Sequence, residues 1–210
     1  MENPKVACTT IKRVLQLIEV DGDESKLSPN VHDRKLSPLT NLEKINVNQD
    51  VIFHGDEFFR FSFVRNPFTR ILSAYLDKIA PPKRSDIREK ININFDGVSF
   101  KEFLNKLKEG NNIKIDIHWV PQHFLLQPRR AHYHFIGRFE YFQTDFQKVI
   151  KRISPLVDQK ILDLKLDYHG RGADQLSEQY IGKEERDLIL KMYEKDFLSF
   201  GYGEDPRNFA

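Results

Sequence analysis

The start of the chain has the residue types and the order of an anion-binding loop. The segment 4–10 (PKVACTT) directly precedes a predicted amphipathic helix that ends at Glu19. Its small side chains let a ligand approach the backbone, and the free N–H groups and the dipole at a helix start attract an anion. The residues that would hold this anion are Lys5, Ala7, Cys8, Thr9 and Thr10. The alternative is a threonine-capped helix after an exposed lysine, since the GxxxxGKS/T pattern of common nucleotide loops is absent.

A second motif, FVRNPFTRILSAY, occupies residues 63–75. The almost wholly apolar segment 58–64 predicts a strand buried on both faces of a parallel sheet. Arg65 then lies at the carboxyl end of this strand, where open α/β sheets bind ligands, and Ser73 follows about two helical turns later. A guanidinium and a hydroxyl can hold one phosphate together. In the alternative interpretation, Arg65 caps the sheet and Ser73 is an ordinary residue of a helix face.

Taken together, the two motifs resemble those of the carbohydrate sulfotransferases, the family-2 group with Golgi-type members. The segments HWVPQ (118–122), FIGRFE (135–140) and YEKDF (193–197) also resemble parts of that family, so the resemblance spans most of the chain. It implies a P-loop-like α/β fold with a central parallel sheet flanked by helices. The animal members carry cysteines after HWxPQ, whereas this chain reads LLQPRR at 125–130, which fits a cytoplasmic, bacterial member.

The resemblance also implies roles for the two motifs. Loop 4–10 would hold the 5′-phosphosulfate of the donor 3′-phosphoadenosine 5′-phosphosulfate (PAPS), with Lys5 stabilising the leaving group. Arg65 and Ser73 would hold its 3′-phosphate. Apart from the resemblance, Arg171 in the loop 169–173 could close over the same group, and the alternative is that this loop is a solvated turn. The implied reaction transfers the sulfuryl group to a hydroxyl of a saccharide or glycoconjugate acceptor without a metal ion.

This transfer needs a base that accepts the proton of the acceptor hydroxyl, and histidine suits that role near neutral pH. His32 is the first candidate, because it lies between the two motifs, where related sulfotransferases place a base histidine. His118 is the second, because Trp119 and Gln122 beside it could line a sugar pocket. For each histidine, a hydrogen-bonded structural role is the alternative.

The order of the predicted elements favours an α/β fold with a parallel sheet. We expect one domain over residues 1–210, with 83–132 as an insertion on the acceptor side. A phosphate loop normally follows a buried strand, but only three residues precede Pro4, so we expect that strand to be missing from this chain. The predicted strands are 58–64 and 133–137, and the predicted helices include 9–19, 67–79, 99–109, 143–153 and 183–199.

Composition excludes several classes of protein. The 33 basic and 31 acidic residues give a net charge of +2, which is too low for a dedicated nucleic-acid binder. Cys8 is the single cysteine, which excludes intrachain disulfides and cysteine-based zinc sites. No segment approaches the ~20 apolar residues of a membrane span. We expect a cytoplasmic protein, which a glycan substrate could bring to a membrane.

Three other classes of function compete with sulfuryl transfer: a non-catalytic binding protein, a structural protein and a kinase. A non-catalytic member of the same fold that binds nucleotide or glycan is the main alternative, and loss of the strand before Pro4 would favour it. The paired motifs argue against a purely structural protein. The absence of a Walker pattern and of a magnesium ligand set argues against a kinase.

Overall fold

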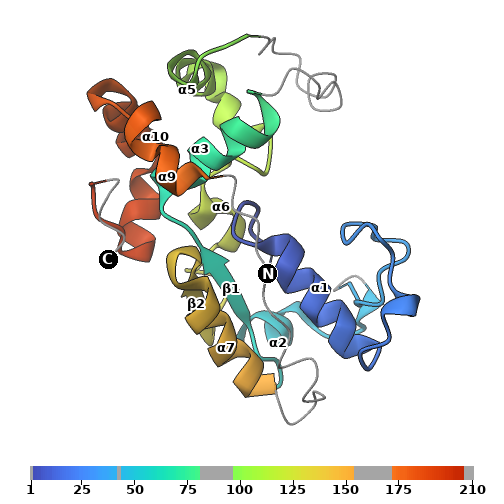
Figure 1. Cartoon of the computed structure of the whole chain (residues 1–210). Coiled ribbons are helices and arrows are strands. Elements are labelled where there is room, and N and C mark those ends of the chain that lie inside the picture. Colours follow the sequence, from blue (N-terminus) through green and yellow to red (C-terminus); the bar gives the residue numbers. More distant parts are fainter. Residues whose placement is uncertain (1, 42–43, 81–96, 154–171, 206–210) are drawn as a thin grey trace.

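The computed structural model describes residues 2–41, 44–80, 97–153 and 172–205 of the chain (Figure 1). Each of its strands is followed along the chain by helices, as the sequence predicts. The strands are β1 (Phe61–Val64) and β2 (Phe135–Arg138). The helices are α1 (Cys8–Glu19), α2 (Gln49–His54), α3 (Pro67–Lys78), α5 (Phe100–Lys108), α6 (Gln122–Leu126), α7 (Phe142–Ile153), α9 (Ala173–Tyr180) and α10 (Lys183–Phe200). Short 3-10 turns are η1 (Glu24–Lys26), η3 (Glu109–Lys114) and η4 (Phe139–Tyr141).

The sheet of the described residues consists of β1 and β2, which run parallel. The register aligns Phe61 with Phe135 and Val64 with Arg138. Gly137 lies opposite Phe63, and a Cβ atom on this glycine would come within 2.4 Å of the phenylalanine ring. The predicted parallel pairing is therefore confirmed, although both strands are shorter than the sequence suggested.

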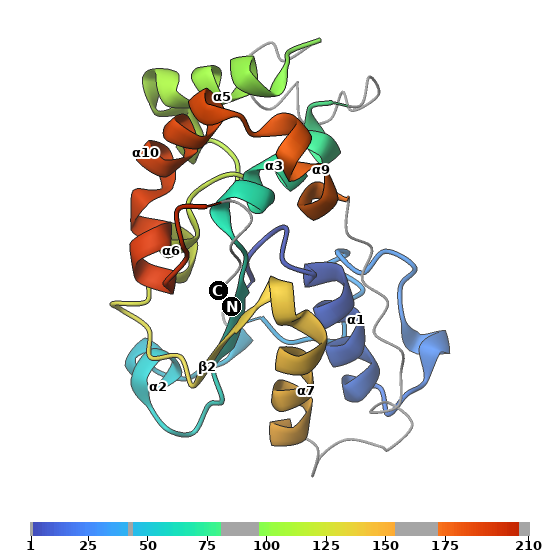
Figure 2. The same ribbon diagram turned by 60° about the vertical axis from the view of Figure 1, so that its left-hand side comes forward.

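One hydrophobic cluster joins the sheet to α1 and α7 (Figures 1 and 2). Phe63 of β1 is 1% exposed and packs against Phe142 and Phe146 of α7, with ring centroids 5.2 and 6.0 Å apart. Val14 and Leu17 of α1 belong to the same cluster. The helix that follows the N-terminal loop is thus anchored to the sheet through its apolar face.

A second hydrophobic cluster lies beyond the carboxyl end of β1 and includes residues of α3, α5, α9 and α10 (Figure 2). The chain passes from β1 into α3 through Asn66, whose side chain accepts a hydrogen bond from the Phe68 N–H at 3.0 Å. Pro67 is the first residue of α3, a position that tolerates its missing N–H. Strand, cap and helix therefore follow the local signals of the sequence.

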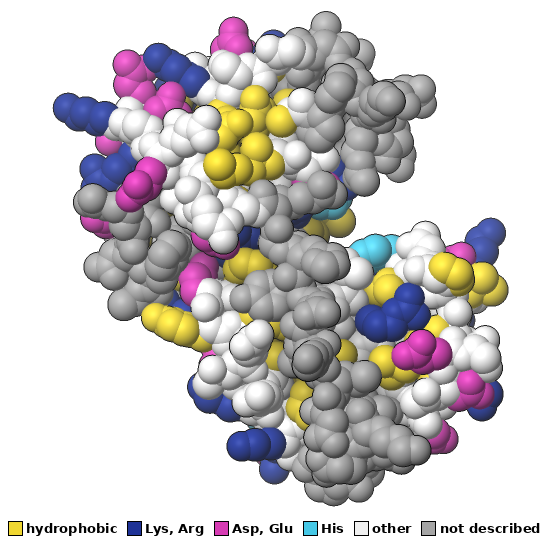
Figure 3. All heavy atoms as spheres, in the orientation of Figure 1, with side chains coloured by type: hydrophobic (Ala, Val, Ile, Leu, Met, Phe, Trp, Pro, Cys, Tyr) yellow, Lys and Arg dark blue, Asp and Glu magenta, His cyan; other side chains and the backbone are white. Residues whose placement is uncertain are grey.

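The two clusters adjoin at β1, because Phe63 belongs to the first and the next residue, Val64, to the second. The surface is deeply hollowed on one side between the two halves, and histidine side chains lie on both walls of this hollow (Figure 3). Segment 81–96 of the predicted insertion lies outside the described residues. In the part that the structure describes, no helix is both long and apolar enough to cross a membrane.

Candidate active site

The N-terminal loop has a backbone shape that suits an anion. Lys5 and Ala7 both adopt left-handed conformations, with φ angles of 72° and 61°. This costs a residue with a side chain roughly 1–2 kcal/mol, and such strain gathers at functional sites. Ala7 is the N-cap of α1, whose first turn has no acidic residue. This backbone conformation and the positive end of the helix dipole suit an anion at the loop.

Side chains from distant segments fix the residues that lead into this loop. The Asn3 amide donates to Phe63 O and to Gln122 Oε1, both at 2.9 Å. The Cys8 thiol donates to Asn3 O at 2.6 Å, and burial raises the pKa of this thiol. Cys8 therefore contributes its backbone position and a loop-internal hydrogen bond, and its thiol is not poised as a nucleophile.

Lys5 lies at the edge of the site, held by a carboxylate. Its Nζ is 3.2 Å from Asp77 Oδ2, and Lys78 Nζ is 3.4 Å from the same oxygen. Burial lowers the pKa of Lys5 to about 8, and the attraction of Asp77 offsets only part of this effect. One carboxylate thus balances two ammonium groups, which leaves net positive charge beside the loop.

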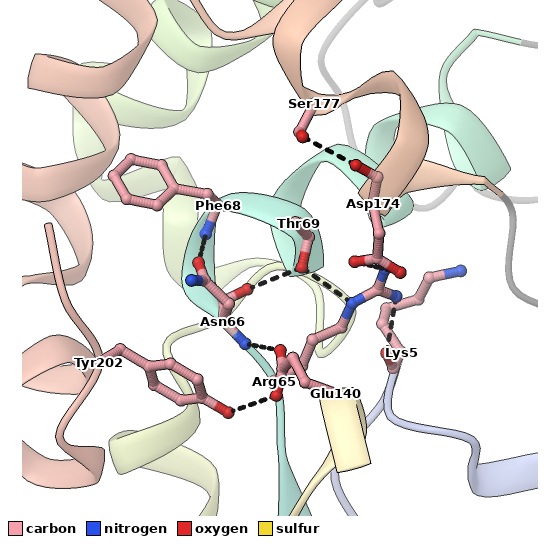
Figure 4. A network of polar contacts seen from close by, with 9 residues as sticks. All are labelled: Lys5, Arg65, Asn66, Phe68, Thr69, Glu140, Asp174, Ser177 and Tyr202. Carbon is pink, nitrogen blue, oxygen red and sulfur yellow. Dashed lines mark hydrogen bonds and ion pairs between the residues drawn. The ribbon is translucent and has the colours of Figure 1, made fainter. Parts of the chain in front are cut away.

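Arg65 joins the two motifs across 60 residues of sequence. Its guanidinium is almost fully buried, lies over the Phe139 ring at 4.2 Å and donates through Nη1 to Lys5 O at 3.3 Å (Figure 4). Nε donates to Thr69 Oγ1 at 3.1 Å. Nη2 lies 2.9 and 3.0 Å from the two carboxylate oxygens of Asp174 on α9. An anion, the Asp174 carboxylate, therefore already occupies the outer side of this guanidinium.

Of the other two predicted ligands of the 3′-phosphate, the structure describes Ser73 but not Arg171. Ser73 is buried on α3, the helix that follows Arg65. Arg171 lies outside the described residues, so its predicted role is unchanged. Thr69 and Asp174, which contact Arg65 directly, are absent from the predicted set. Thr69 could have been found, because it stands one helical turn after Arg65, whereas Asp174 is 109 residues away.

Glu140 supports the turn between β1 and α3. Its carboxylate accepts hydrogen bonds from the Asn66 N–H at 2.6 Å and from the Tyr202 hydroxyl at 3.0 Å (Figure 4). Burial raises the pKa of Glu140, while these hydrogen bonds act in the opposite direction. The segment FIGRFE thus ends in a residue that holds Arg65 and Asn66 in place.

His32 lies beside the first turn of α1. Its Nε2 is 3.1 Å from Thr9 Oγ1, and its Nδ1 is 3.3 Å from Lys12 Nζ. Loss of water around the ring lowers the pKa of His32 most, and the charge of Lys12 lowers it further. The histidine also borders a cavity of about 300 Å³ whose wall includes Glu2 and Asp33. The structure therefore brings His32 to the N-terminal loop, as predicted.

His118 lies in the same region. A positive charge on His118, when that ring is protonated, contributes to the lowered pKa of His32, and the charge of Lys78 acts on both His32 and Asp116. His118 Nδ1 is 2.5 Å from Asp116 Oδ1, which also accepts the His118 backbone N–H at 2.8 Å. The charge of Lys78 therefore acts on Lys5, on His32 and on Asp116, the partner of His118, so the three residues that the sequence proposed as catalytic lie around this lysine.

Arg70 connects the segment around His118 to the N-terminal loop. Its buried guanidinium donates to Pro4 O at 3.1 Å, to Val120 O at 2.8 Å and to Ile117 O at 3.2 Å. Sequence analysis did not single out this arginine. Its fixed fork of donors binds three carbonyls that come from two distant segments.

The expected sugar-lining role of Trp119 and Gln122 is wrong. Trp119 is 0% exposed and packs edge-on against Phe103 in the core. Gln122 is equally buried. Its amide oxygen accepts a hydrogen bond from the Arg65 N–H at 2.9 Å, and its amide nitrogen donates to the Arg65 carbonyl at 2.7 Å. Burial and saturation of their polar atoms leave neither side chain available to a ligand.

His132 and His134 lie in the segment that leads into β2, and Arg60, the residue before β1, pairs with His134. The His134 N–H donates to Arg60 O at 2.9 Å, and its Nδ1 accepts from the Arg60 N–H at 3.2 Å. Both rings lie just before β2, at the amino end of the sheet, whereas Arg65 lies at the carboxyl end.

Comparison with known proteins agrees with this geometry. The sulfotransferase family matches residues 3–203, so the chain belongs to that family. Human carbohydrate sulfotransferase 9 is 29% identical over 96% of this chain and 50% of its own length. Human carbohydrate sulfotransferase 14 is 30% identical over 70% of this chain and 42% of its own length. Carbohydrate sulfotransferase 10 of Xenopus laevis is 27% identical over 97% of this chain and 64% of its own length. The chain thus spans about half the length of these curated relatives. No solved structure is significantly similar to it.

Proposed function

We propose that this protein transfers a sulfuryl group from PAPS to a hydroxyl of a carbohydrate. The observation that carries the proposal is the contact between the two motifs, in which Arg65 of the second donates to the Lys5 carbonyl of the first at 3.3 Å. A basic anion loop and a buried arginine thus share one site, as a nucleotide with phosphate groups at both its 5′ and 3′ positions requires. The family match supports the same conclusion.

The donor would bind with its 5′-phosphosulfate over the first turn of α1 and its 3′-phosphate toward Arg65. Backbone N–H groups after Ala7 and the hydroxyls of Thr9 and Thr10 suit the phosphosulfate oxygens. The guanidinium of Arg65 and the hydroxyl of Ser73 suit the 3′-phosphate. When bound, this nucleotide supplies an activated sulfuryl group and a phosphate leaving group.

The protein's own groups would act on charge and protons. The acceptor oxygen bonds to sulfur in line with the bond that breaks between sulfur and the bridging oxygen, and the bonding electrons remain on that oxygen. Lys5 and the dipole of α1 stabilise the charge that develops there. A histidine accepts the proton of the acceptor hydroxyl. Lysine and backbone donors supply the positive charge that this chemistry needs, so we propose that no metal ion takes part.

The acceptor is proposed as a carbohydrate because the similar curated proteins are named carbohydrate sulfotransferases. The hollow beside the histidines offers an approach from solvent for a sugar hydroxyl (Figure 3). The predicted insertion 83–132 would contribute to the choice of saccharide, and its residues 83–96 lie outside the described part of the chain.

Turnover tests the proposal. Purified protein is incubated with PAPS labelled in its sulfuryl group and with a panel of glycosaminoglycans, polysaccharides and simple glycosides, and labelled product is measured. We expect transfer to at least one acceptor, abolished in Lys5→Ala and retained in Lys183→Ala, which removes an exposed lysine at the start of α10. Release of adenosine 3′,5′-bisphosphate without any labelled acceptor, or activity that survives Lys5→Ala, would contradict the proposal.

A further inference from the structure

The described residues contain two aspartate–histidine pairs of the same local geometry. In the first, Asp116 Oδ1 accepts the His118 N–H at 2.8 Å and lies 2.5 Å from Nδ1. In the second, Asp196 Oδ1 accepts the His123 N–H at 2.8 Å and lies 2.6 Å from Nδ1. The first pair lies at the candidate site, whereas the second joins α6 to α10.

Burial distinguishes the two aspartates. Asp196 is 0% exposed, and its second oxygen accepts the Gln122 N–H at 2.7 Å, so this carboxylate caps the start of α6. The side chain of Asp116 is 20% exposed, while the two histidine side chains are exposed alike, at 25% for His118 and 23% for His123. Asp196 therefore holds a helix start as well as a histidine, whereas the Asp116 side chain lies near the surface beside His118.

Asp116 is in the charged state that orients a histidine. Burial alone would raise its pKa, but the hydrogen bonds from His118 outweigh this effect and hold the pKa below its usual value. A charged carboxylate accepts only, so His118 must carry its proton on Nδ1, and its Nε2 keeps a lone pair. Such an aspartate also stabilises the imidazolium that forms when the ring accepts a proton.

His32 is engaged in a different way. The Lys12 ammonium can only donate, so Nδ1 of His32 accepts from it, and the ring proton lies on Nε2, directed at Thr9 Oγ1. Neither ring nitrogen then keeps a lone pair for a substrate proton. Protonation would also place an imidazolium beside the Lys12 ammonium, which raises the electrostatic cost.

We propose that His118 is the general base of the transfer and that Asp116 is its positioning residue, with His32 fixing the first turn of α1 instead. This inference rests on the proposed function. The proton of the acceptor hydroxyl passes to His118 Nε2 as the oxygen–sulfur bond forms, and the electrons of the broken sulfur–oxygen bond stay on the departing phosphate near Lys5. Arg70 holds the N-terminal loop beside the segment that contains His118, because its guanidinium donates to the carbonyls of Pro4 and Ile117.

Two substitutions of His118 test the base. The variant His118→Asn keeps an amide that can donate to Asp116 but provides no base, and we expect kcat to fall about 10²–10⁴-fold with the Kd for adenosine 3′,5′-bisphosphate unchanged. His118→Ala leaves space for a small molecule, and added imidazole should restore part of its kcat. His32→Ala should lose less activity, and imidazole should not restore it.

Asp116→Asn tests the positioning residue, with His123→Asn as the matched change in the second pair. We expect Asp116→Asn to lower kcat with little change in KM, and to lose the Nδ1–H signal of His118 in ¹⁵N-resolved NMR spectra. His123→Asn should lower thermal stability and leave kcat within threefold of the wild type. The inference is overturned if His118→Asn retains kcat within threefold, or if imidazole rescues His32→Ala and not His118→Ala. If the wild type itself transfers no sulfuryl group, the proposed function fails instead.

Discussion

At the scale of single residues, the site combines backbone strain with a desolvated cation. Lys5 adopts a left-handed conformation and is largely buried, and both features cost free energy that the fold must supply. In exchange, an ammonium group is fixed beside the anion-binding loop, and within the described part of the chain Asp77 is the carboxylate paired with it. A lysine with an ordinary pKa would keep its charge at every physiological pH, so the lowered pKa of Lys5 gives this residue a measurable signature.

The pH dependence of kcat/KM should report Lys5, because this parameter follows the ionisation of the free enzyme. The charged form is the active one, and its pKa is lowered to about 8, so kcat/KM should fall as the pH rises above that value. In Lys5→Arg the guanidinium stays charged to above about pH 12, and the alkaline decline should disappear even if the absolute rate is lower.

Lys78→Arg is the control for this profile, because Lys78 shares Asp77 with Lys5. The control should keep the decline near pH 8. A decline that persists unchanged in Lys5→Arg would mean that another group causes it, and Lys5 would lose its assigned role.

At the scale of elements, α9 governs access to Arg65. The helix begins after Gly172, which has a φ angle of 67°, and its first turn places Asp174 on the guanidinium. A 3′-phosphate and the Asp174 carboxylate would compete for the same Nη2 group. Nucleotide binding should therefore displace this carboxylate, and its removal should favour the bound state.

The variant Asp174→Asn should bind adenosine 3′,5′-bisphosphate more tightly than the wild type. We expect a gain of about tenfold, which corresponds to about 1.4 kcal/mol, together with a lower free energy of unfolding in the absence of nucleotide. Calorimetric titration measures the affinity. Glu178→Gln removes an exposed carboxylate from the same helix and should change neither quantity. Weaker binding in Asp174→Asn would show that the aspartate orients Arg65 for the phosphate rather than competing with it.

At the scale of the whole molecule, Arg70 connects three segments that are far apart in sequence. The arginine lies on α3, and its hydrogen bonds reach Pro4 in the N-terminal loop and both Ile117 and Val120 in the segment around His118. Arg70 therefore helps to fix the position of the N-terminal loop relative to the segment around His118.

Arg70→Met should destabilise the fold, because it leaves the three carbonyls without this donor. A buried polar group without its partner costs about 1–3 kcal/mol, so we expect the free energy of unfolding to fall by about 3 kcal/mol or more. Chemical denaturation followed by circular dichroism measures this change. Arg34→Met, at an exposed arginine, should stay within about 0.5 kcal/mol of the wild type. If both variants had the same free energy of unfolding, the hydrogen bonds of Arg70 would not stabilise the fold, and this prediction would be wrong.

The sequence predicted those parts of the fold that depend on local signals. The apolar segment before Arg65 became β1, and the Asn66-Pro67 pair began α3, because cap and helix start are encoded by adjacent residues. The pairing of Asp116 with His118 is also local and could have been predicted. Trp119 was misassigned, since sequence alone does not say toward which side a residue in an irregular segment points.

Contacts between distant segments could not be predicted. Asp174 meets Arg65 across 109 residues, and Gln122 bonds the backbone of Arg65 across 57. No periodicity or motif encodes such pairs, because they arise only when the two hydrophobic clusters bring α3, α6 and α9 together. These contacts nevertheless decide what the arginine can bind.

The central claim is that Arg65 and the loop around Lys5 form one binding site for a nucleotide with phosphates at both positions. Isothermal titration calorimetry tests it directly, with adenosine 3′,5′-bisphosphate compared with adenosine 5′-monophosphate on the wild type and on Arg65→Ala. We expect tight binding of the bisphosphate alone, and loss of this binding in a folded Arg65→Ala variant. Equal affinity for both nucleotides, or no binding by a folded wild-type protein, would contradict it.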